Sequence, residues 1–323
     1  MITPVSPYPI KFCSQPMERI WGGRRLAQQL MLASAAPIGE VWTLSGHPSA
    51  VSVCQNGPWA GLTLPQIVAA HPDAYLGRAD SDPFPVLVKF IDAASNLSVQ
   101  VHPDDQVAAR LCGQRGKTES WYVTAVAADA RVIVGLELSS AEQLRQAVVD
   151  GRLEENLVYR SVAPGDLVHI PAGTVHALCG GVQVIEIQQC SDLTFRLFDW
   201  NRVGVGGLPR QLHIEEALHA IHFGAAPCSA SAAVVSAPLS SGARHLIQCE
   251  SYAIDELRLT RQTAFPTPGR PLVLIVVRGQ GQLQFAEHTC QLRFGDTFLL
   301  PSSGQGFSLQ PEGQLTALLV AYS

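Results

Sequence analysis

The chain has 323 residues, of which 47% are hydrophobic and 15% are charged, and its formal net charge is −5. This length and composition favour well-buried globular cores, enough for two domains, and exclude a largely disordered chain. The acidic balance argues against a broad basic surface, so no nucleic-acid partner is expected.

The N-terminus and the cysteines indicate where the protein resides. No basic region followed by an apolar core opens the chain, and no apolar run approaches the ~18 residues of a membrane span. The eight cysteines are scattered without a Cys-x-x-Cys pair, which predicts reduced, mostly buried thiols. We therefore expect a soluble, unexported cytoplasmic protein with no membrane partner, while the oligomeric state stays open.

Short strands bounded by glycine and proline turns dominate the predicted elements. In chain order, strands are expected at 39–45, 86–91, 97–102, 120–126, 131–135, 182–189, 194–200 and on both sides of a turn within 272–285. Helices are expected at 62–70, 104–115 and 214–221, and the capping box Ser139-Ser140-Ala141-Glu142 predicts another that reaches Val149.

Two pairs of neighbouring strands are expected to pair directly. Strand 120–126 is predicted to pair with 131–135 through the turn between them, and Gly279-Gln280-Gly281 is predicted to be a hairpin turn. Many short strands joined by such turns predict antiparallel double-sheet barrels.

One strand carries side chains that suit a metal ion. Hydrophobic and polar residues alternate from Leu97 onward, so three polar side chains share one face of the strand: Ser98, Gln100 and His102. Two of them, Gln100 and His102, are competent metal ligands. Both side chains therefore point to the same side of the strand.

A later stretch has the spacing Gly165-x5-Pro171-x-Gly173-x2-His176. It resembles the second sequence motif of the cupin jelly rolls, in which glycines make the turns and the histidine enters the barrel. Residues 295–304 repeat the first half of the pattern, but Gly306 stands about where the histidine would be.

The cupin resemblance implies a mainly β fold of two cupin-like jelly-roll barrels with a few short inserted helices. We expect a metal-containing catalytic domain over 1–225 and a second cupin-like domain without metal ligands over 226–323. The Ala/Ser-rich stretch 225–241 is the expected boundary between them.

Within the first barrel, the same resemblance implies four metal ligands. The usual His-x-His pair appears as Gln100-Val101-His102, and the usual carboxylate is delayed to Glu119 by the inserted helix. With His176 they form a mixed nitrogen and oxygen set that suits Zn²⁺, with Mn²⁺ or Fe²⁺ as competitors. Alone, His176 fits a hydrogen-bonded core histidine and Gln100 an ordinary polar strand residue, but their joint occurrence favours the metal site.

Four stretches together resemble the type I mannose-6-phosphate isomerase family in its short bacterial form: 97–105, 116–122, 164–178 and 188–199. The resemblance implies that one Zn²⁺ ion supports the interconversion of mannose 6-phosphate and fructose 6-phosphate, so that the partner is a sugar-phosphate substrate. It also implies that Arg196 is the active-site arginine and that Lys89, Ser98 and Lys117 line the substrate pocket.

The implied reaction moves a proton between neighbouring carbons through a cis-enediolate, and negative charge develops on oxygen. Arg196 would supply a permanent cation there, with a salt bridge to Asp192 or Asp199 as the structural alternative. Lys117 is open to three roles: a phosphate-binding cation, a proton-transfer group with a lowered pKa, or a solvated loop residue. We favour substrate contact for Lys117.

The proton-transfer group is not given by the resemblance. Longer family members resemble Asn-His-Lys-Pro-Glu at the loop before the ligand carboxylate, whereas this chain has Gly116 in place of the histidine and Thr118 in place of the proline. A histidine base is therefore excluded at this loop. Glu186, on an alternating strand, is the expected proton-transfer carboxylate, with orientation of His176 or Arg196 as its alternative role.

Two other functions suit the same scaffold. A metal-dependent cupin oxygenase would prefer iron and an additional histidine where Gln100 stands. A non-catalytic sugar-phosphate-binding cupin would need neither Zn²⁺ nor an acid–base group. Gln100 argues against the oxygenase, and the complete ligand set together with Arg196 argues against the binding protein.

Overall fold

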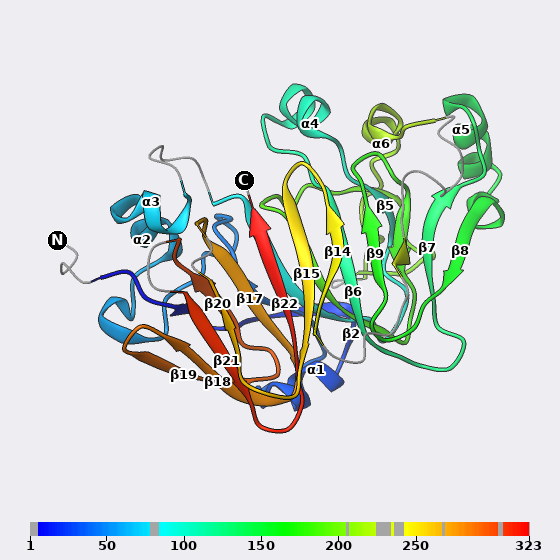
Figure 1. The fold of residues 1–323 in the computed structure, drawn as a ribbon. Helices are drawn as coiled ribbons and strands as arrows, with labels where there is room; N and C mark the ends of the chain where they lie inside the picture. Colours follow the sequence, from blue (N-terminus) through cyan, green and yellow to red (C-terminus); the bar gives the residue numbers. More distant parts are fainter. Residues whose placement is uncertain are drawn as a thin grey trace. The chain divides into compact units, whose positions relative to one another are not determined.

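The computed structural model describes residues 6–77, 84–204, 207–223, 234–235, 242–266, 269–302 and 306–322. These residues form mainly β-strands, with six α-helices among them (Figure 1). None of the helices in these ranges has the length and apolar character needed to cross a membrane. The cysteines in the same ranges all carry free thiols, but only Cys54 and Cys179 are buried, so the prediction of mostly buried thiols was wrong.

The chain divides into two compact units that interleave along the sequence. Unit 1 comprises Met1–Gln15, Trp42–Val88 and Pro238–Ser323, and unit 2 comprises Pro16–Val41 and Lys89–Ala237. Strand pairing explains why the N-terminal residues join unit 1, because β1 (Ile10–Lys11) pairs with β20 (Thr297–Leu300). The sequence predicted one boundary near residue 225, and that linear domain assignment stays a prediction. Most of the stretch 225–241 lies outside the described residues.

Unit 1 is built around two antiparallel sheets. The six-stranded sheet has the order β1, β20, β17 (Leu272–Arg278), β22 (Leu315–Tyr322), β15 (Tyr252–Leu259) and β14 (Gly242–Gln248). The four-stranded sheet has the order β16 (Thr263–Phe265), β21 (Phe307–Pro311), β18 (Gln280–Phe285) and β19 (His288–Arg293). Unit 1 also contains η1 (Gly57–Trp59), α2 (Leu64–Ala70) and α3 (Pro72–Tyr75).

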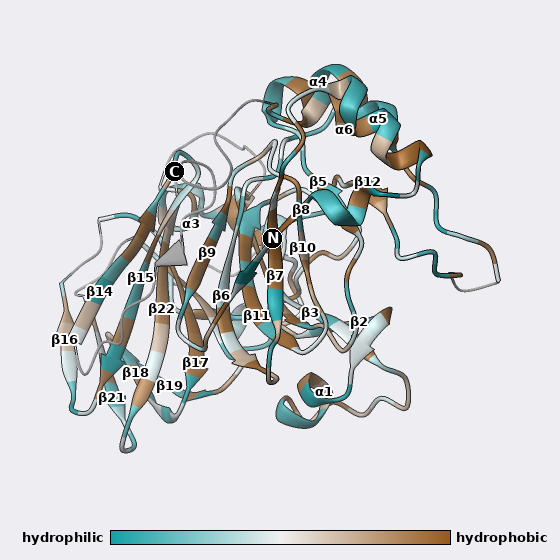
Figure 2. Cartoon of the chain, turned by 90° about the vertical axis from the view of Figure 1, so that its right-hand side faces the viewer, coloured by the Kyte–Doolittle hydropathy of each residue, from teal (hydrophilic) through white to brown (hydrophobic). Residues whose placement is uncertain are grey.

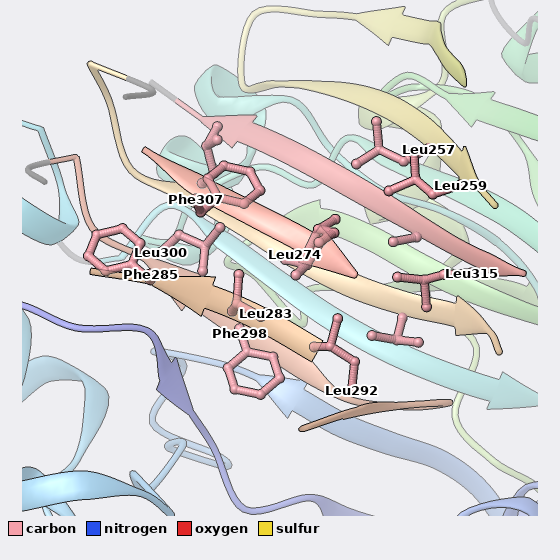
Figure 3. Close-up of a cluster of buried hydrophobic side chains, with 14 of the residues drawn as sticks. Leu257, Leu259, Leu274, Leu283, Phe285, Leu292, Phe298, Leu300, Phe307 and Leu315 are labelled. Atoms are coloured by element: carbon pink, nitrogen blue, oxygen red, sulfur yellow. The ribbon is translucent and has the colours of Figure 1, made fainter. Parts of the chain in front are cut away.

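One hydrophobic cluster joins the two sheets of unit 1. Leu274 and Phe298 come from the six-stranded sheet, and Leu283 and Leu292 from the four-stranded sheet (Figure 3). Burial of each such side chain contributes about 1.5–3 kcal/mol. Gly306 occupies about the position at which the cupin motif has a ligand histidine, and it precedes β21 with φ +81°. Gly304 lies outside the described residues.

A seven-stranded and a five-stranded sheet build most of unit 2. The seven-stranded sheet has the order β13 (Val234–Val235), β9 (Leu167–Ile170), β6 (Glu119–Val126), β11 (Val182–Gln189), β4 (Val86–Asp92), β3 (Ile38–Leu44) and β2 (Gln15–Gly23). The five-stranded sheet has the order β12 (Phe195–Phe198), β5 (Val99–Val101), β10 (His176–Leu178), β7 (Arg131–Leu136) and β8 (Leu157–Ser161). Unit 2 also contains α1 (Arg25–Gln29) and η2 (Leu153–Asn156).

Three helices of unit 2 lie together near β5 and β12: α4 (Asp105–Cys112), α5 (Ala141–Val149) and α6 (Ile214–Ala220) (Figure 2). Val99 and Val101 of β5 pack in one hydrophobic cluster with Leu144 of α5 and Ala217 of α6. This packing fixes which face of β5 is apolar. The polar residue between the two valines, Gln100, therefore points to the opposite face.

The predicted helices form close to their expected bounds, and local chemistry sets their ends. Asp104 is the N-cap of α4 and accepts a hydrogen bond from Val107 N at 2.8 Å. The predicted capping box of α5 is displaced by one residue, because Ser140 is the N-cap and accepts from Gln143 N. The side chain of Gln143, not that of Glu142, accepts from Ser139 N.

Both predicted strand pairings were wrong for the same reason. β6 pairs with β9 and β11, whereas β7 pairs with β8 and β10 in the other sheet of unit 2. Likewise β17 pairs with β20 and β22, whereas β18 pairs with β19 and β21. Each connecting turn therefore carries the chain from one sheet to the opposing sheet, as jelly-roll connections do.

The turn at Gly279 should tolerate no side chain. Gly279 has φ +88°, and a Cβ there would clash with the carbonyl oxygen of Gln314, whereas Gly313, at φ +84°, has open space around it. We predict that Gly279→Ala lowers the free energy of unfolding by about 3 kcal/mol and Gly313→Ala by about 1 kcal/mol, because only the first adds a clash to the backbone strain. Urea unfolding measures both, and equal losses would contradict the steric argument.

Candidate metal centre and active site

Three of the four predicted ligands meet inside unit 2. His102 follows β5, Glu119 begins β6 and His176 begins β10, and none is more than 1% exposed. Their ligand atoms all lie within 4.8 Å of one another. Glu119 Oε1 is 3.3 Å from His176 Nε2, and Glu119 Oε2 is 3.3 Å from His102 Nε2. This is the one such cluster that the described residues form.

Backbone carbonyl groups orient both imidazole rings. His102 Nδ1 lies 2.8 Å from the carbonyl oxygen of Leu193, and His176 Nδ1 lies 2.8 Å from that of Thr174. Because a carbonyl oxygen only accepts, we infer that each Nδ1 carries the proton. Each Nε2 then turns its lone pair toward Glu119, as metal-binding histidines with such partners do. Lys117 Nζ lies 3.2 Å from Nε2 of His102, and Gln100 Nε2 lies 3.3 Å from Nε2 of His176.

Gln100 stands at the edge of this cluster. It is the cross-strand neighbour of His176, and its Nε2 lies 3.3 Å from His176 Nε2. Its Oε1 accepts a hydrogen bond of 3.4 Å from Ser98 Oγ. The amide therefore presents its nitrogen to the cluster, and a half-turn of the same amide would present its oxygen.

The loop before Glu119 folds back onto the strand that carries His102. Lys117 N donates to the carbonyl oxygen of Pro103 at 3.0 Å, and Gly116 N donates to Asp105 Oδ1 at 2.7 Å. A Cβ at Gly116 would lie 2.5 Å from backbone atoms of Asp104 and Asp105. These contacts place Glu119 next to His102 although α4 lies between them in the sequence. The backbone also leaves no room for a histidine side chain at position 116.

A buried chain of alternating charges extends from the ligand cluster. Lys117 Nζ lies 2.8 Å from Glu119 Oε2, 3.2 Å from His102 Nε2 and 3.5 Å from Glu186 Oε1. Lys89 Nζ lies 3.6 Å from Glu186 Oε1 and 3.3 Å from Asp192 Oδ1. The three predicted residues Lys89, Lys117 and Glu186 are therefore brought together with the ligands.

Burial and these charges set the protonation of the site. Burial, reinforced by the Lys117 ammonium, lowers the pKa of His102 to about 3, and burial also lowers the pKa of His176. Burial alone would raise the pKa of Glu119, but the Lys117 ammonium outweighs it and holds that pKa well below its ordinary value. The cluster therefore offers two neutral imidazoles and one carboxylate at neutral pH.

Glu186 and Lys117, which lie next to each other, both have raised pKa values. Burial and the nearby Glu119 charge raise the pKa of Glu186. Burial would lower the pKa of Lys117, but Glu119 and Glu186 outweigh it and raise that pKa above its ordinary value. Lys117 therefore keeps its positive charge at neutral pH, which favours substrate contact over a proton-transfer role for this lysine.

The donor set fits a divalent metal ion. Both oxygens of Glu119 are buried and accept no hydrogen bond, and the nearest cation is the Lys117 ammonium, 2.8 Å from Oε2. An ionised carboxylate in such surroundings costs several kcal/mol unless a cation compensates it. Two imidazole lone pairs beside one carboxylate are ligands typical of Zn²⁺.

Arg196 lies on β12 directly across from Gln100. Its Nη1 donates to the carbonyl oxygen of Gln211 at 2.8 Å, while its Nε is buried without a hydrogen-bond partner. Burial and the nearby Arg210 lower the pKa of Arg196, yet a guanidinium stays charged in proteins.

The two acidic residues considered as partners of Arg196 bind other cations. Asp199 accepts from Arg202 Nη2 at 2.6 Å and from Arg210 Nε at 2.7 Å. Asp192 lies 3.3 Å from Lys89 Nζ. The predicted alternative of a simple salt bridge for Arg196 is therefore not what the structure shows.

Sequence comparison identifies the family to which this site belongs. Residues 10–123 match the family model of the phosphomannose isomerase type I catalytic domain, and residues 243–320 match that of the mannose-6-phosphate isomerase cupin domain. The mannose-6-phosphate isomerase of Streptococcus mutans is 33% identical over 96% of this chain and 97% of its own length. The chain belongs to the type I mannose-6-phosphate isomerase family. It is therefore an enzyme of the isomerase class, and the expected cupin fold class is confirmed.

Further proteins named as mannose-6-phosphate isomerases resemble this chain in sequence or in fold. The probable mannose-6-phosphate isomerase GmuF of Bacillus subtilis is 35% identical over 91% of this chain and 93% of its own. A mannose 6-phosphate isomerase structure from Bacillus subtilis superposes with a TM-score of 0.89 at 31% identity, covering 97% of this chain and 99% of that one. A zinc-bound mannose 6-phosphate isomerase shares the fold with a TM-score of 0.74 at 18% identity, covering 96% and 98%.

Two contacts of this isomerase site were not foreseen from the sequence. Trp121 Nε1 donates to Glu186 Oε2 at 3.1 Å, and the Leu193 carbonyl orients His102. A signal for Trp121 existed, because a residue two positions after Glu119 on a strand shares its face. No sequence signal marks a backbone carbonyl.

The Asp199 cluster that follows Arg196 should stabilise the isomerase in a pH-dependent way. Burial would raise the pKa of Asp199, but hydrogen bonds from Arg210 and Arg202 lower it below its ordinary value. A depressed folded-state pKa stabilises the protein above the unfolded value near 3.9, and that stability is lost as pH falls through the folded-state value. We predict that Asp199→Asn loses about 1–3 kcal/mol at pH 7 and that the deficit narrows below about pH 4.

Urea unfolding at several pH values measures this effect. Asp150→Asn is the control, because Asp150 pairs with Arg152 on the surface and exposed pairs contribute little. A deficit for Asp199→Asn that stays constant down to pH 3 would contradict the assignment.

Proposed function

We propose that the chain is a zinc-dependent aldose–ketose isomerase that interconverts mannose 6-phosphate and fructose 6-phosphate through a cis-enediolate. The observation that carries the proposal is the buried cluster of His102, Glu119 and His176, whose ligand atoms lie within 4.8 Å of one another while both Glu119 oxygens accept no hydrogen bond. It is supported by relatives that are named mannose-6-phosphate isomerases over nearly their whole length.

One Zn²⁺ ion would be held by His102, Glu119, His176 and, after a half-turn of its amide, by Gln100. When bound, such an ion supplies Lewis acidity toward the sugar oxygens. The donor set favours Zn²⁺, with Mn²⁺ and Fe²⁺ as competitors. Ser98 Oγ now donates to Gln100 Oε1, and after the half-turn it would accept from the Gln100 amide nitrogen instead. We assign Ser98 to the substrate pocket together with Lys89.

Glu186 is the proposed proton-transfer group. It would take the proton from C2 of the open-chain aldose and return it to C1, while the proton of the O2 hydroxyl moves to O1, which gives the ketose. Burial raises its pKa, and a carboxyl group with a raised pKa exchanges protons more readily near neutral pH. Its side-chain contacts are with Trp121, Lys89 and Lys117, which favours this role over the alternative of orienting His176 or Arg196.

Three cations would balance the charge of substrate and enediolate. Arg196 provides a charge that is never lost, close in the sheet to the Gln100 ligand position. Lys117 keeps its charge because its pKa is raised, so it acts by electrostatic stabilisation and substrate binding. Lys89 joins Lys117 at Glu186.

The competing functions have less support. Relatives named as isomerases disfavour both a cupin oxygenase and a non-catalytic sugar-phosphate-binding cupin. The His102, Glu119 and His176 cluster beside Glu186, whose pKa is raised, further disfavours the binding protein. A cytoplasmic location stays a prediction.

Metal removal and return test the proposed function. We predict that protein stripped with a chelator does not convert mannose 6-phosphate to fructose 6-phosphate and that Zn²⁺ restores conversion, because the carbonyl is then polarised. Separate additions of Mn²⁺ and Fe²⁺ rank the competitors, and His176→Ala should gain activity from none of them. Full conversion by metal-free protein would contradict the proposal, and oxygen uptake with Fe²⁺ alone would indicate the oxygenase.

Substitution of Arg196 tests its catalytic role. We predict that Arg196→Ala binds zinc and folds normally but loses about 10²–10³-fold in kcat, because a preorganised charge next to the developing oxyanion is removed. Arg196→Lys should recover part of that loss through its charge alone. Steady-state kinetics with metal analysis measures both variants, and near-normal turnover of Arg196→Ala would remove this residue from the mechanism.

A further inference from the structure

Trp121 connects the proposed proton carrier to a metal ligand. On β6 it lies directly across from Glu186 of β11 and two residues after Glu119. It is 1% exposed, and its indole Nε1–H donates to Glu186 Oε2 at 3.1 Å. Its ring meets the ring of His176 edge to face, with centroids 5.5 Å apart and planes at 67°.

The indole distinguishes the two oxygens of Glu186. Oε2 accepts the Trp121 hydrogen bond. Oε1 lies 3.5 Å from Lys117 Nζ and 3.6 Å from Lys89 Nζ, and it is buried with no hydrogen-bond partner. A carboxylate without the indole donor would be able to rotate and pair both oxygens with the two ammonium groups. Trp121 therefore fixes the plane of the carboxylate.

We propose that Trp121 is a positioning residue that holds Glu186 so that Oε1, and not Oε2, exchanges the substrate proton. This inference rests on the proposed role of Glu186 in proton transfer. The indole ring also packs against His176, so a single rigid side chain fixes the proton-transfer group relative to the metal ligands. Misplacement of a reacting group by about 1 Å costs on the order of 10²-fold in rate.

The donor, and not the bulk of the ring, carries this role. A buried indole N–H usually finds a hydrogen-bond partner, and phenylalanine keeps an aromatic ring beside His176 but offers no donor. Trp59 of unit 1 provides a matched control, because it is equally buried, at 1% exposure, and its Nε1 has no hydrogen-bond partner. Trp59→Phe therefore reports the cost of shrinking a buried tryptophan alone.

The test compares Trp121→Phe with Trp59→Phe in the zinc-loaded protein. We expect Trp121→Phe to lower kcat by about 10–100-fold, with KM and bound zinc unchanged, since general base catalysis weakens when its geometry is lost. Trp59→Phe should leave kcat unchanged while shifting the urea midpoint. Benzothienylalanine at position 121, which keeps the bicyclic shape and lacks only the N–H, should reproduce the loss even if Trp121→Phe does not fold.

Glu186→Gln separates failure of this inference from failure of the proposed function. Near-normal turnover of Glu186→Gln overturns the role of Glu186 and this inference with it. An inactive Glu186→Gln beside wild-type kcat in both Trp121 variants overturns this inference alone, as does loss of zinc in parallel with activity. Support requires that adding Trp121→Phe to Glu186→Gln lowers kcat no further, because the two residues then act as one unit.

Discussion

The Glu119 carboxylate is buried completely, and the rest of the site is arranged around its charge. Such a group costs several kcal/mol unless cations and hydrogen bonds compensate it. Here the Lys117 ammonium supplies one positive charge at 2.8 Å, and two imidazoles present lone pairs, not protons, toward the same oxygens. That combination leaves a position that a divalent cation completes. The low pKa values of the ligands follow from the same arrangement.

The jelly-roll connections of unit 2 make this arrangement possible. Gln100 and His176 belong to the five-stranded sheet, whereas Glu119, Trp121 and Glu186 belong to the seven-stranded sheet. A metal ion held by both groups would cross-link the two sheets of the unit. Zinc binding and the folding of this unit would then be coupled, because ligand positions on two sheets coincide only in the folded chain.

Local patterns in the sequence predicted much of this. Alternation placed Gln100 opposite Val99 and Val101, and the packing of both valines with the helices confirms it, whereas Leu97 packs in the other cluster with Trp121. Asp104 capped a helix within one residue of its expected start. Predictions that depended on residues far away in the sequence were less successful. The turns at 127–130 and 279 join strands of different sheets, not neighbouring strands of one sheet. Asp199 pairs with Arg202 and Arg210, and Arg196 donates to the Gln211 carbonyl oxygen instead. Strand order and ion-pair choice depend on residues far apart in the sequence, which periodicity does not encode.

An anomalous difference map at the zinc absorption edge, from crystals of zinc-reconstituted protein, tests the central claim most directly. The site described above predicts one peak, bonded to Nε2 of His102, Nε2 of His176, the Glu119 carboxylate and the side-chain oxygen of Gln100, at about 2.0–2.2 Å from each. Crystals of active enzyme whose zinc peak lies away from Glu119, or that show no peak at all, would contradict it.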